Sequence, residues 1–324
     1  MNGEKMLKKF FVIIIVFVLT FTTFAEDLSD KWWGTTVPSA FMIYIVNPQK
    51  LAGWPAKLYS YEAAYLPDEY KKLPILGSWH EGGGLPDKEM LLKHNIKNAF
   101  LITSAVHREE KYTELKKLRM KEVFTIKGEN LRDNIALLRE LGKKLGVPER
   151  GEALAEYGEN ALAQAASMTK DIKRRPKVYI AERSDGLTTS CTSEILSLAG
   201  GENAFTCDKS ITKGFTKVSF EQILALDPDV VIVTNPFFAE TVKSDPKWQR
   251  LRAYKENNLF IVPYGPFGWL DKPAVMRFIA LKWLACKLHS DKCEIEMETE
   301  TKEFMKLFLH LELTDDEVKT ILYR

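Results

Sequence analysis

The sequence has 324 residues, with 46 Lys and Arg against 44 Asp and Glu, which gives a formal net charge of +2. This near balance argues against a surface built to bind nucleic acid or another polyanion over its whole area. The length suits two domains of ordinary size.

The first 25 residues have the pattern of a signal peptide. Lys5, Lys8 and Lys9 precede an apolar run from Phe10 to Leu19, and residues 23–25 place small side chains at alternate positions. A membrane anchor is the alternative, but the run is shorter than the roughly 20 residues that a spanning helix needs. We expect cleavage after residue 25, which brings the net charge to about zero. No cysteine lies near this site, so we expect a periplasmic protein without a lipid anchor.

Four cysteines, Cys191, Cys207, Cys286 and Cys293, enter this oxidising compartment. Their spacing allows short loops closed by Cys191–Cys207 and Cys286–Cys293 disulfides, although three connectivities are possible. A metal site is the rival interpretation. It is weakly supported, because the sequence has no CxxC pair and only His289 lies near any of the four.

The N-terminal lobe, expected over residues 26–147, shows short apolar segments separated by loops and helices. Residues 40–46 are mostly apolar, but their number does not separate a strand from a helix. Glycine and proline interrupt the chain around expected strands at residues 51–55 and 73–80. Further strands are expected at 99–103 and 121–126, and helices at 87–93 and, after an Asn130 cap, through residue 145.

A long helix is expected from Pro148 to Arg175 as the connection between two lobes. Pro148 fits a first helical turn, an apolar stripe recurs every three or four residues, and Pro176 ends the pattern. Gly151 and Gly158 each weaken the helix by about 1 kcal/mol relative to Ala, so tertiary packing must help to hold it.

Residues 176–324 repeat the pattern of short strands and helices as a C-terminal lobe. Strands are expected at 177–181, 230–233 and 258–263. Helices are expected after a Thr192 or Ser193 cap, at 218–225 and 274–288, and as two surface helices at the end of the chain. The alternation predicts an α/β fold: two Rossmann-like lobes with parallel sheets, joined by one long helix, with a ligand cleft between them.

Ligand sites of parallel sheets lie at the carboxyl ends of the strands. The residues expected there are aromatic or basic, which predicts a cleft for a partly apolar, anionic ligand. They are Trp54, Trp79, His80, Arg108, Arg183, Tyr264 and Trp269.

Several segments resemble the substrate-binding proteins of ABC importers for iron complexes, cobalamin and related metal chelates. The matching segments are Leu51-Ala52-Gly53-Trp54, residues 73–78, Ser184-Asp185-Gly186-Leu187, residues 199–204, residues 218–224 with Asp227-Pro228-Asp229, and residues 266–271 with 281–285. Together they span almost the whole mature chain, and the rigid inter-lobe helix of that family coincides with residues 148–175.

The resemblance implies a monomeric, non-enzymatic carrier with no intrinsic cofactor, which delivers a metal chelate, iron favoured, to a permease dimer in the inner membrane. Glu89 and Glu221 match the carboxylates that the family presents to permease arginines. Relatives often have a histidine after the Asp-Gly-Leu turn, but here this segment is short and contains none. His80 is then the best candidate for a metal donor, because a neutral imidazole suits Fe, Ni, Zn or Co. Arg108 and Arg183 can bind an anionic chelate through paired hydrogen bonds.

Three other functions are alternatives to this one. A secreted hydrolase needs an activated nucleophile, but the Gly-x-Ser-x-Gly elbow is absent from the sequence. The same fold can instead hold an oxyanion such as molybdate or tungstate, or a cobalamin or haem. The aromatic residues favour a larger chelate over a bare oxyanion, because stacking surface contributes little to binding a small hydrated anion.

Overall fold

The computed structural model describes residues 27–80, 84–102, 108–118, 120–126, 130–191, 193–207, 214–265, 267–270 and 274–323. The predicted signal peptide lies outside these ranges. Within them, no helix combines the length and the apolar character that crossing a membrane requires.

The N-terminal lobe is built on a three-stranded parallel sheet in the order β1-β4-β5. These strands are β1 (Trp32–Gly34), β4 (Asn98–Ile102) and β5 (Glu122–Ile126), and a separate antiparallel pair comprises β2 (Gly77–His80) and β3 (Gly84–Pro86). The helices are α1 (Val37–Val46), α2 (Ser60–Ala63), α3 (Asp68–Lys71), α4 (Lys88–Lys93), α5 (Arg108–Lys117) and α6 (Leu131–Lys144).

The apolar segment whose type was ambiguous forms helix α1. Thr36 caps it by accepting a hydrogen bond from the Ser39 backbone N–H, and Pro38 fits the first turn. Residues 39–46 are all buried, so no polar face marks the helical period in the sequence. The predicted strand at residues 51–55 forms only isolated bridges, through Leu51 and Trp54.

The C-terminal lobe is built on a four-stranded parallel sheet in the order β11-β10-β6-β8. Its strands are β6 (Lys177–Ala181), β8 (Glu202–Asn203), β10 (Val230–Val233) and β11 (Leu259–Ile261), and an antiparallel pair comprises β7 (Thr188–Ser190) and β9 (Phe215–Lys217). The helices are α8 (Glu194–Leu198), α9 (Phe220–Leu226), α10 (Pro236–Val242), α11 (Arg252–Lys255), α12 (Arg277–Leu288), α13 (Met297–Leu309) and α14 (Asp315–Leu322).

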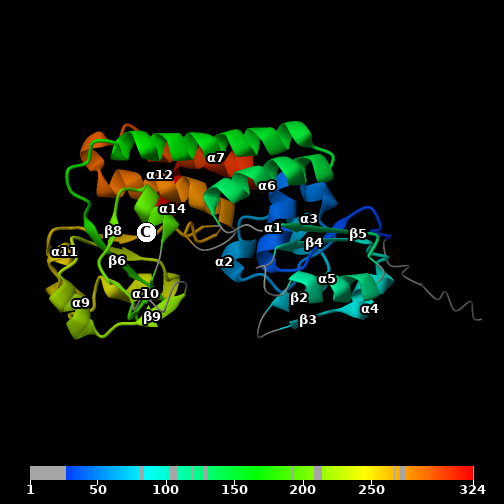
Figure 1. The fold of residues 1–324 in the computed structure, drawn as a ribbon, viewed down its shortest axis with the longest axis horizontal. Coiled ribbons are helices and arrows are strands. Elements are labelled where there is room, and N and C mark those ends of the chain that lie inside the picture. The colour runs from blue at the N-terminus through cyan, green and yellow to red at the C-terminus, as the bar shows by residue number, and fades with distance from the viewer. Residues whose placement is uncertain are drawn as a thin grey trace, which may run out of the picture.

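Helix α7 (Pro148–Thr169) runs along one side of the molecule and covers both lobes (Figure 1). It begins at the predicted residue but ends before Arg175, because the chain turns at Lys170 and Asp171 on its way to β6. Its 22 residues make it about 33 Å long, enough to connect two small domains. The two-lobed α/β fold is therefore confirmed, with a shorter connecting helix than predicted.

Two glycines in α7 permit close packing against the neighbouring helices. A Cβ atom on Gly151 would lie 2.7 Å from the Leu138 carbonyl oxygen and 2.9 Å from the Gly142 Cα on α6. A Cβ on Gly158 would lie 2.8 Å from side-chain atoms of Ile135 and Phe278. The residues that weaken α7 as an isolated helix are thus those that let α6 and α12 approach it.

We expect Gly151→Ala to lower the free energy of unfolding by about 1–3 kcal/mol, because the new methyl group meets backbone atoms that have little room to move. The gain of about 1 kcal/mol in helix propensity should not offset this cost. Urea unfolding measures the difference, with Ser167→Ala on the exposed part of α7 as the control that should lose no stability. A more stable Gly151→Ala protein would contradict this packing.

Hydrogen bonds of Arg150 and His310 connect the C-terminal helix α13 to the N-terminal lobe. The Arg150 guanidinium donates to the carbonyl oxygens of Ile45 (2.8 Å) and Leu307 (2.6 Å), and lies 3.1 Å from His310 Nε2. His310 has a φ of +58° at the end of α13. Burial and the neighbouring Arg150 charge lower the pKa of His310 below its ordinary value.

We therefore expect stability to fall on acidification. A histidine with a lowered folded-state pKa contributes its full stability above the unfolded-state pKa, about 6.5, and loses it as the pH falls towards the folded-state pKa. His310→Asn, whose residue type tolerates positive φ, should reduce the loss of stability between pH 7.5 and 5.5 in urea unfolding. Part of the dependence should remain, because burial also lowers the pKa of His289. An unchanged pH dependence in the variant would exclude His310 as its source.

Candidate functional site

A pocket of about 470 Å³ lies where the strands of the C-terminal sheet end. Ile180, Glu182 and Arg183 come from the end of β6, Thr234 to Phe237 follow β10, and Tyr264 follows β11. The remaining lining residues are Tyr59, Ser190, Ser193, Glu194, Ile195, Phe215, Leu270 and Arg277. Tyr59 is the contribution of the N-terminal lobe among them. The pocket therefore occupies the strand-end position that the parallel sheet predicts.

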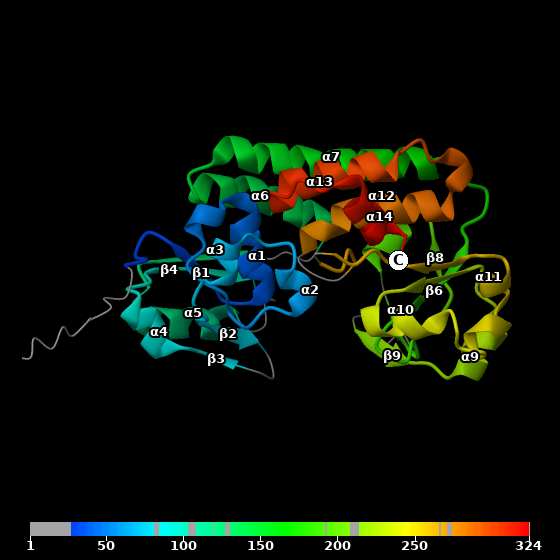
Figure 2. The same cartoon turned by 180° about the vertical axis from the view of Figure 1, so that it is seen from behind.

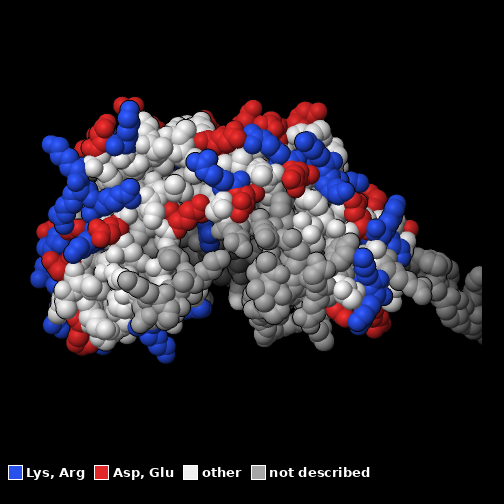
Figure 3. Space-filling view, in the orientation of Figure 1, with Lys and Arg blue, Asp and Glu red and all other residues white. Residues whose placement is uncertain are grey.

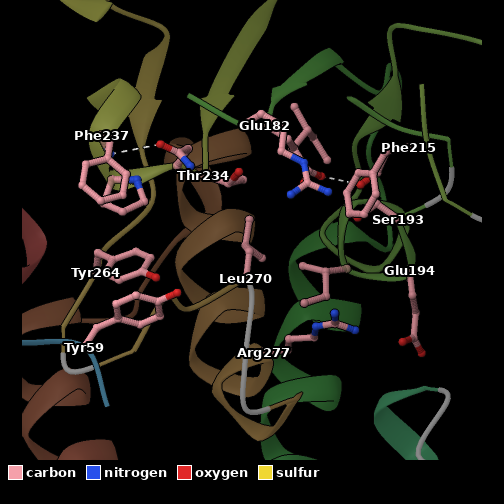
Figure 4. A pocket seen from close by; sticks show the side chains of 16 residues that line it. Tyr59, Glu182, Ser193, Glu194, Phe215, Thr234, Phe237, Tyr264, Leu270 and Arg277 are labelled. Atoms are coloured by element: carbon pink, nitrogen blue, oxygen red, sulfur yellow. Dashed lines mark hydrogen bonds between the residues drawn. The ribbon is translucent and has the colours of Figure 1, made fainter. Parts of the chain in front are cut away.

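Aromatic rings form two sides of this pocket. Tyr59, Tyr264 and Phe237 lie on one side, Phe215 lies on the other, and Leu270 lies between them (Figure 4). Three of these rings are more exposed than buried: Tyr59 at 60%, Phe215 at 53% and Phe237 at 66%. Exposed rings at the rim can be covered by the apolar part of a ligand, which would remove them from water.

Arg183 is held at the rim by a rigid turn. It has a φ of +63°, and the Tyr179 hydroxyl donates to the Gly186 carbonyl oxygen (2.9 Å) across the same turn. Gly186 has a φ of +68° and packs against Phe238 and Trp248 so closely that no Cβ would fit. Burial raises the pKa of Tyr179, so its hydroxyl stays protonated and keeps donating. The Arg183 guanidinium lies 5.1 Å from the centre of the Phe215 ring.

Arg277, the first residue of α12, lies at the base of the pocket in Figure 4. It is half-buried, and no hydrogen bond or ion pair joins its guanidinium to another residue in the described ranges. A guanidinium presents a fixed fork of donors that matches a carboxylate or phosphate. Arg277 is thus a cation available to an anionic ligand.

The two carboxylates of the pocket already have partners. The Ser190 hydroxyl donates to Glu182, and the Leu131 backbone N–H at the start of α6 donates to both oxygens of Glu194, at 3.1 and 3.2 Å. The second contact links the two lobes, because α6 belongs to the N-terminal lobe and Glu194 to the C-terminal lobe. The positive end of the α6 dipole also favours the Glu194 charge there.

A disulfide fixes the segment beside the pocket. It joins Cys191 to Cys207, and the Asn203 side-chain amide donates to the Ser190 carbonyl oxygen (2.9 Å) in the same segment. The second disulfide joins Cys286 to Cys293 beyond the pocket, where α12 ends. These are the two short-loop pairs that the sequence favours. No group of three or more His, Cys, Asp or Glu side chains that could hold a metal ion occurs among the residues described.

The structure brings two of the predicted ligand residues, Arg183 and Tyr264, together in the pocket. The side chains of Trp79, His80 and Arg108 lie outside the described part of the structure, so their predicted roles remain predictions.

The placement of Trp54 and Trp269 in the cleft needs correction. Trp54 is 1% exposed: its indole N–H donates to the Tyr70 carbonyl oxygen (2.7 Å), and its ring centre lies 4.7 Å from that of Phe41. Trp269 is completely buried in the same core as Phe267 and Val262. Both rings are thus removed from water in the core, and neither is open to a ligand in the cleft.

Sequence reasoning missed Arg277, Tyr59, Phe215 and Phe237. The position of Arg277 carried a signal, because it is a charged residue near the beginning of an otherwise strongly apolar helix. The three aromatic residues gave none, because nothing in the local sequence distinguishes a ring at the pocket rim from one in the core.

Glu89 and Glu221 lie in the first turns of α4 and α9 and are both exposed. Figure 2 shows α4 and α9 on different lobes, each on the side of the molecule away from α7. The two helices thus lie on the same side of the molecule, away from α7.

Comparison with known proteins gives a consistent result. A family model described as periplasmic binding protein matches residues 107–264. The fold is similar to an ABC transporter solute binding protein from Sulfurospirillum deleyianum, with a TM-score of 0.80 and 31% identity over 90% of this chain and 93% of that one. It is also similar to a periplasmic solute binding protein from Veillonella parvula, with a TM-score of 0.76 and 26% identity over 92% and 93%. The high-affinity heme uptake system protein IsdE of Staphylococcus aureus is 22% identical over 216 residues, 63% of this chain and 70% of IsdE.

Proposed function

This chain belongs to the family of periplasmic binding proteins that serve ABC importers, and on that premise we propose that it captures an anionic metal chelate, with an iron–siderophore complex favoured. The ligand would bind in the pocket between the lobes and pass to a permease in the inner membrane. The family consists of substrate-binding proteins, so the chemistry required of the site is recognition and release.

The observation that carries the choice of ligand is the combination of four aromatic rings with two available arginines in one pocket of about 470 Å³. This volume is within the range of roughly 300–1,000 Å³ that small-molecule sites occupy. A bare oxyanion would use the arginines but would leave the rings exposed. A chelate would supply the metal donors itself, and His80 remains the candidate for a donor from the protein.

Native mass spectrometry of the protein purified from its own periplasm, together with metal analysis, tests the proposal. We expect a bound organic mass together with one equivalent of iron or another transition metal. Bound molybdate or tungstate without an organic mass would replace the chelate with an oxyanion. A haem or cobalamin mass would assign a tetrapyrrole ligand, which the similarity to IsdE makes the most direct alternative.

We propose that Glu89 and Glu221 form the contact with the permease. Glu89→Ala and Glu221→Ala should leave ligand affinity unchanged and lower the rate of uptake several-fold, because both carboxylates are exposed and neither lines the pocket. Calorimetric titration and an uptake assay separate the two effects. Glu149→Ala, an exposed carboxylate on α7, is the matched control and should change neither. Loss of ligand affinity in the Glu89 or Glu221 variant would mean that the carboxylate contributes to ligand binding, and that its assignment to the permease contact is wrong.

A further inference from the structure

A second hollow in the N-terminal lobe, of about 530 Å³, lies where the strands of its sheet begin. Residues at or just before the starts of β1, β4 and β5 line it, together with the short helical turn that contains Lys50 and the end of α6. We call this hollow the lysine groove, because Lys50, Lys97, Lys121 and Lys144 all line it. The candidate ligand pocket lies elsewhere, at the carboxyl ends of the strands of the C-terminal sheet.

The charges in the lysine groove do not balance. Two carboxylates line it: Asp30 pairs with Lys50 at 3.0 Å, and Glu122 pairs with Lys144. Lys97 and Lys121 form no ion pair with any residue that the structure describes. The two are held next to each other, because the Lys121 backbone N–H donates to the Lys97 carbonyl oxygen at 2.7 Å. Two ammonium groups at neighbouring strand starts are therefore left for an external anion.

A further hydrogen-bond donor lies at the same place. Trp32 is 4% exposed and lines the groove, and its indole N–H donates to no acceptor among the residues described. The neighbouring Trp33 shows the usual arrangement, since its indole N–H donates to the Gly77 carbonyl oxygen at 3.1 Å. The Trp32 indole nitrogen is not one of the buried polar atoms that lack a partner, so its N–H is open to the solvent in the groove. An acceptor oxygen of a ligand in the groove can take the place of that solvent.

Nearby acceptors of the protein are already occupied. The Leu145 carbonyl oxygen at the end of α6 accepts from the Asn47 side chain at 3.0 Å, and the Asn98 amide donates to the carbonyl oxygens of Ser29 and Lys31. In Figure 3, Lys and Arg atoms lie along this outer end of the N-terminal lobe, with Asp and Glu atoms among them. The groove thus offers donors and positive charge to a ligand.

We propose that the lysine groove is a second binding site, for a small polyanion with phosphate groups such as pyrophosphate. Lysine binds phosphate as a mobile point charge, and two unpaired lysines match two charged groups better than one. The volume also exceeds what a single phosphate ion would fill. The phosphate groups could belong to a free anion or to the headgroup of an anionic lipid, since the recognised chemistry is the same.

Calorimetric titration with pyrophosphate at 150 mM salt tests the site, using the full mature protein. Saturable binding is expected, and Lys97→Gln/Lys121→Gln should weaken it at least tenfold. The matched control is Lys88→Gln/Lys93→Gln on α4, which removes the same charge from an exposed helix outside the groove and should bind like the wild type. Equal weakening in both double variants, or no saturable binding to the wild type, would overturn the proposal.

Two further measurements complete the test. Trp32→Phe keeps most of the ring but removes the indole donor, so it should weaken pyrophosphate binding several-fold while the protein stays folded by circular dichroism. Sedimentation with phosphatidylglycerol vesicles identifies the source of the phosphate: groove-dependent sedimentation assigns a lipid headgroup, and its absence assigns a free anion. Affinity for the metal chelate should be unchanged in the Lys97→Gln/Lys121→Gln variant, so failure of this site would leave the proposed transport function unaffected.

Discussion

Replacing Arg277 by Ala is expected to weaken binding of an anionic metal chelate by about 10–100-fold. Arg277 is half-buried at the base of the pocket, and the described part of the chain supplies no partner for it. A hydrogen bond to a charged group contributes about 1.5–3 kcal/mol, and each 1.4 kcal/mol is a factor of ten in affinity. The ligand anion would also lose its hydrogen-bonding partner in the pocket.

Three variants separate this role of Arg277 from a general effect of charge. Arg277→Lys keeps the charge but not the planar fork of donors, so it should recover only part of the affinity. Arg183→Ala should lose less affinity than Arg277→Ala, because Arg183 is exposed at the rim. Arg250→Ala removes an exposed arginine outside the pocket and should bind normally. Calorimetric titration with the purified ligand measures all four variants. An Arg277→Ala protein with wild-type affinity would show that the ligand does not reach the base of the pocket.

The largest loss of stability is expected from breaking the buried ion pair between Lys282 and Glu300. Lys282 on α12 is 2% exposed, and its ammonium lies 2.8 Å from Glu300 Oε1 on α13 and 4.3 Å from the centre of the Tyr157 ring on α7. The Tyr157 hydroxyl also donates to Glu300. Burial and the Glu300 charge raise the pKa of Tyr157, so it remains a donor. Three helices therefore share this one charged group.

Lys282→Met should lower the free energy of unfolding by about 3–5 kcal/mol, because among the described residues it leaves the buried Glu300 carboxylate with the Tyr157 hydroxyl as its remaining donor. The double variant Lys282→Met/Glu300→Leu removes both charges and should recover much of this loss. Lys306→Met is the control, since Lys306 pairs with Glu312 on the surface and should contribute about 1 kcal/mol or less. Urea unfolding measures each value. A double variant no more stable than Lys282→Met would show that packing, rather than the uncompensated charge, is what Lys282 provides.

Local signals in the sequence predicted most of the secondary structure. Asn130 caps α6 as predicted, and Ser193, one of the two predicted candidates, caps α8, because a short polar side chain before an apolar run can accept a hydrogen bond from a free backbone N–H. Pro148 begins α7, and the apolar segments at residues 230–233 and 177–181 are adjacent parallel strands. In each case the residues that decide the conformation are neighbours in the chain.

The site was predictable only in part. The strand-end rule points to the ends of β6, β10 and β11, where the structure has a pocket lined by two of the predicted residues, Arg183 and Tyr264. The rule failed for Trp54. Whether a ring near a strand end faces the cleft or the core depends on the residues that surround it. For Trp54 these include Phe41 and Tyr70, which belong to other elements. The rule missed Arg277 because that residue is the first of a helix and does not follow a strand.

The amino-acid sequence was sufficient to predict the α/β class of the chain, the existence and start of the connecting helix, and the strand ends at which the candidate pocket lies. Each depends on local backbone preference and on the spacing of apolar residues, which a short segment contains in full. The tertiary structure alone decided which aromatic rings are buried, how Gly151 approaches α6, and that Leu131 binds Glu194 across the lobes. These features depend on distances between segments far apart in the chain, and only the packing of the complete fold sets those distances.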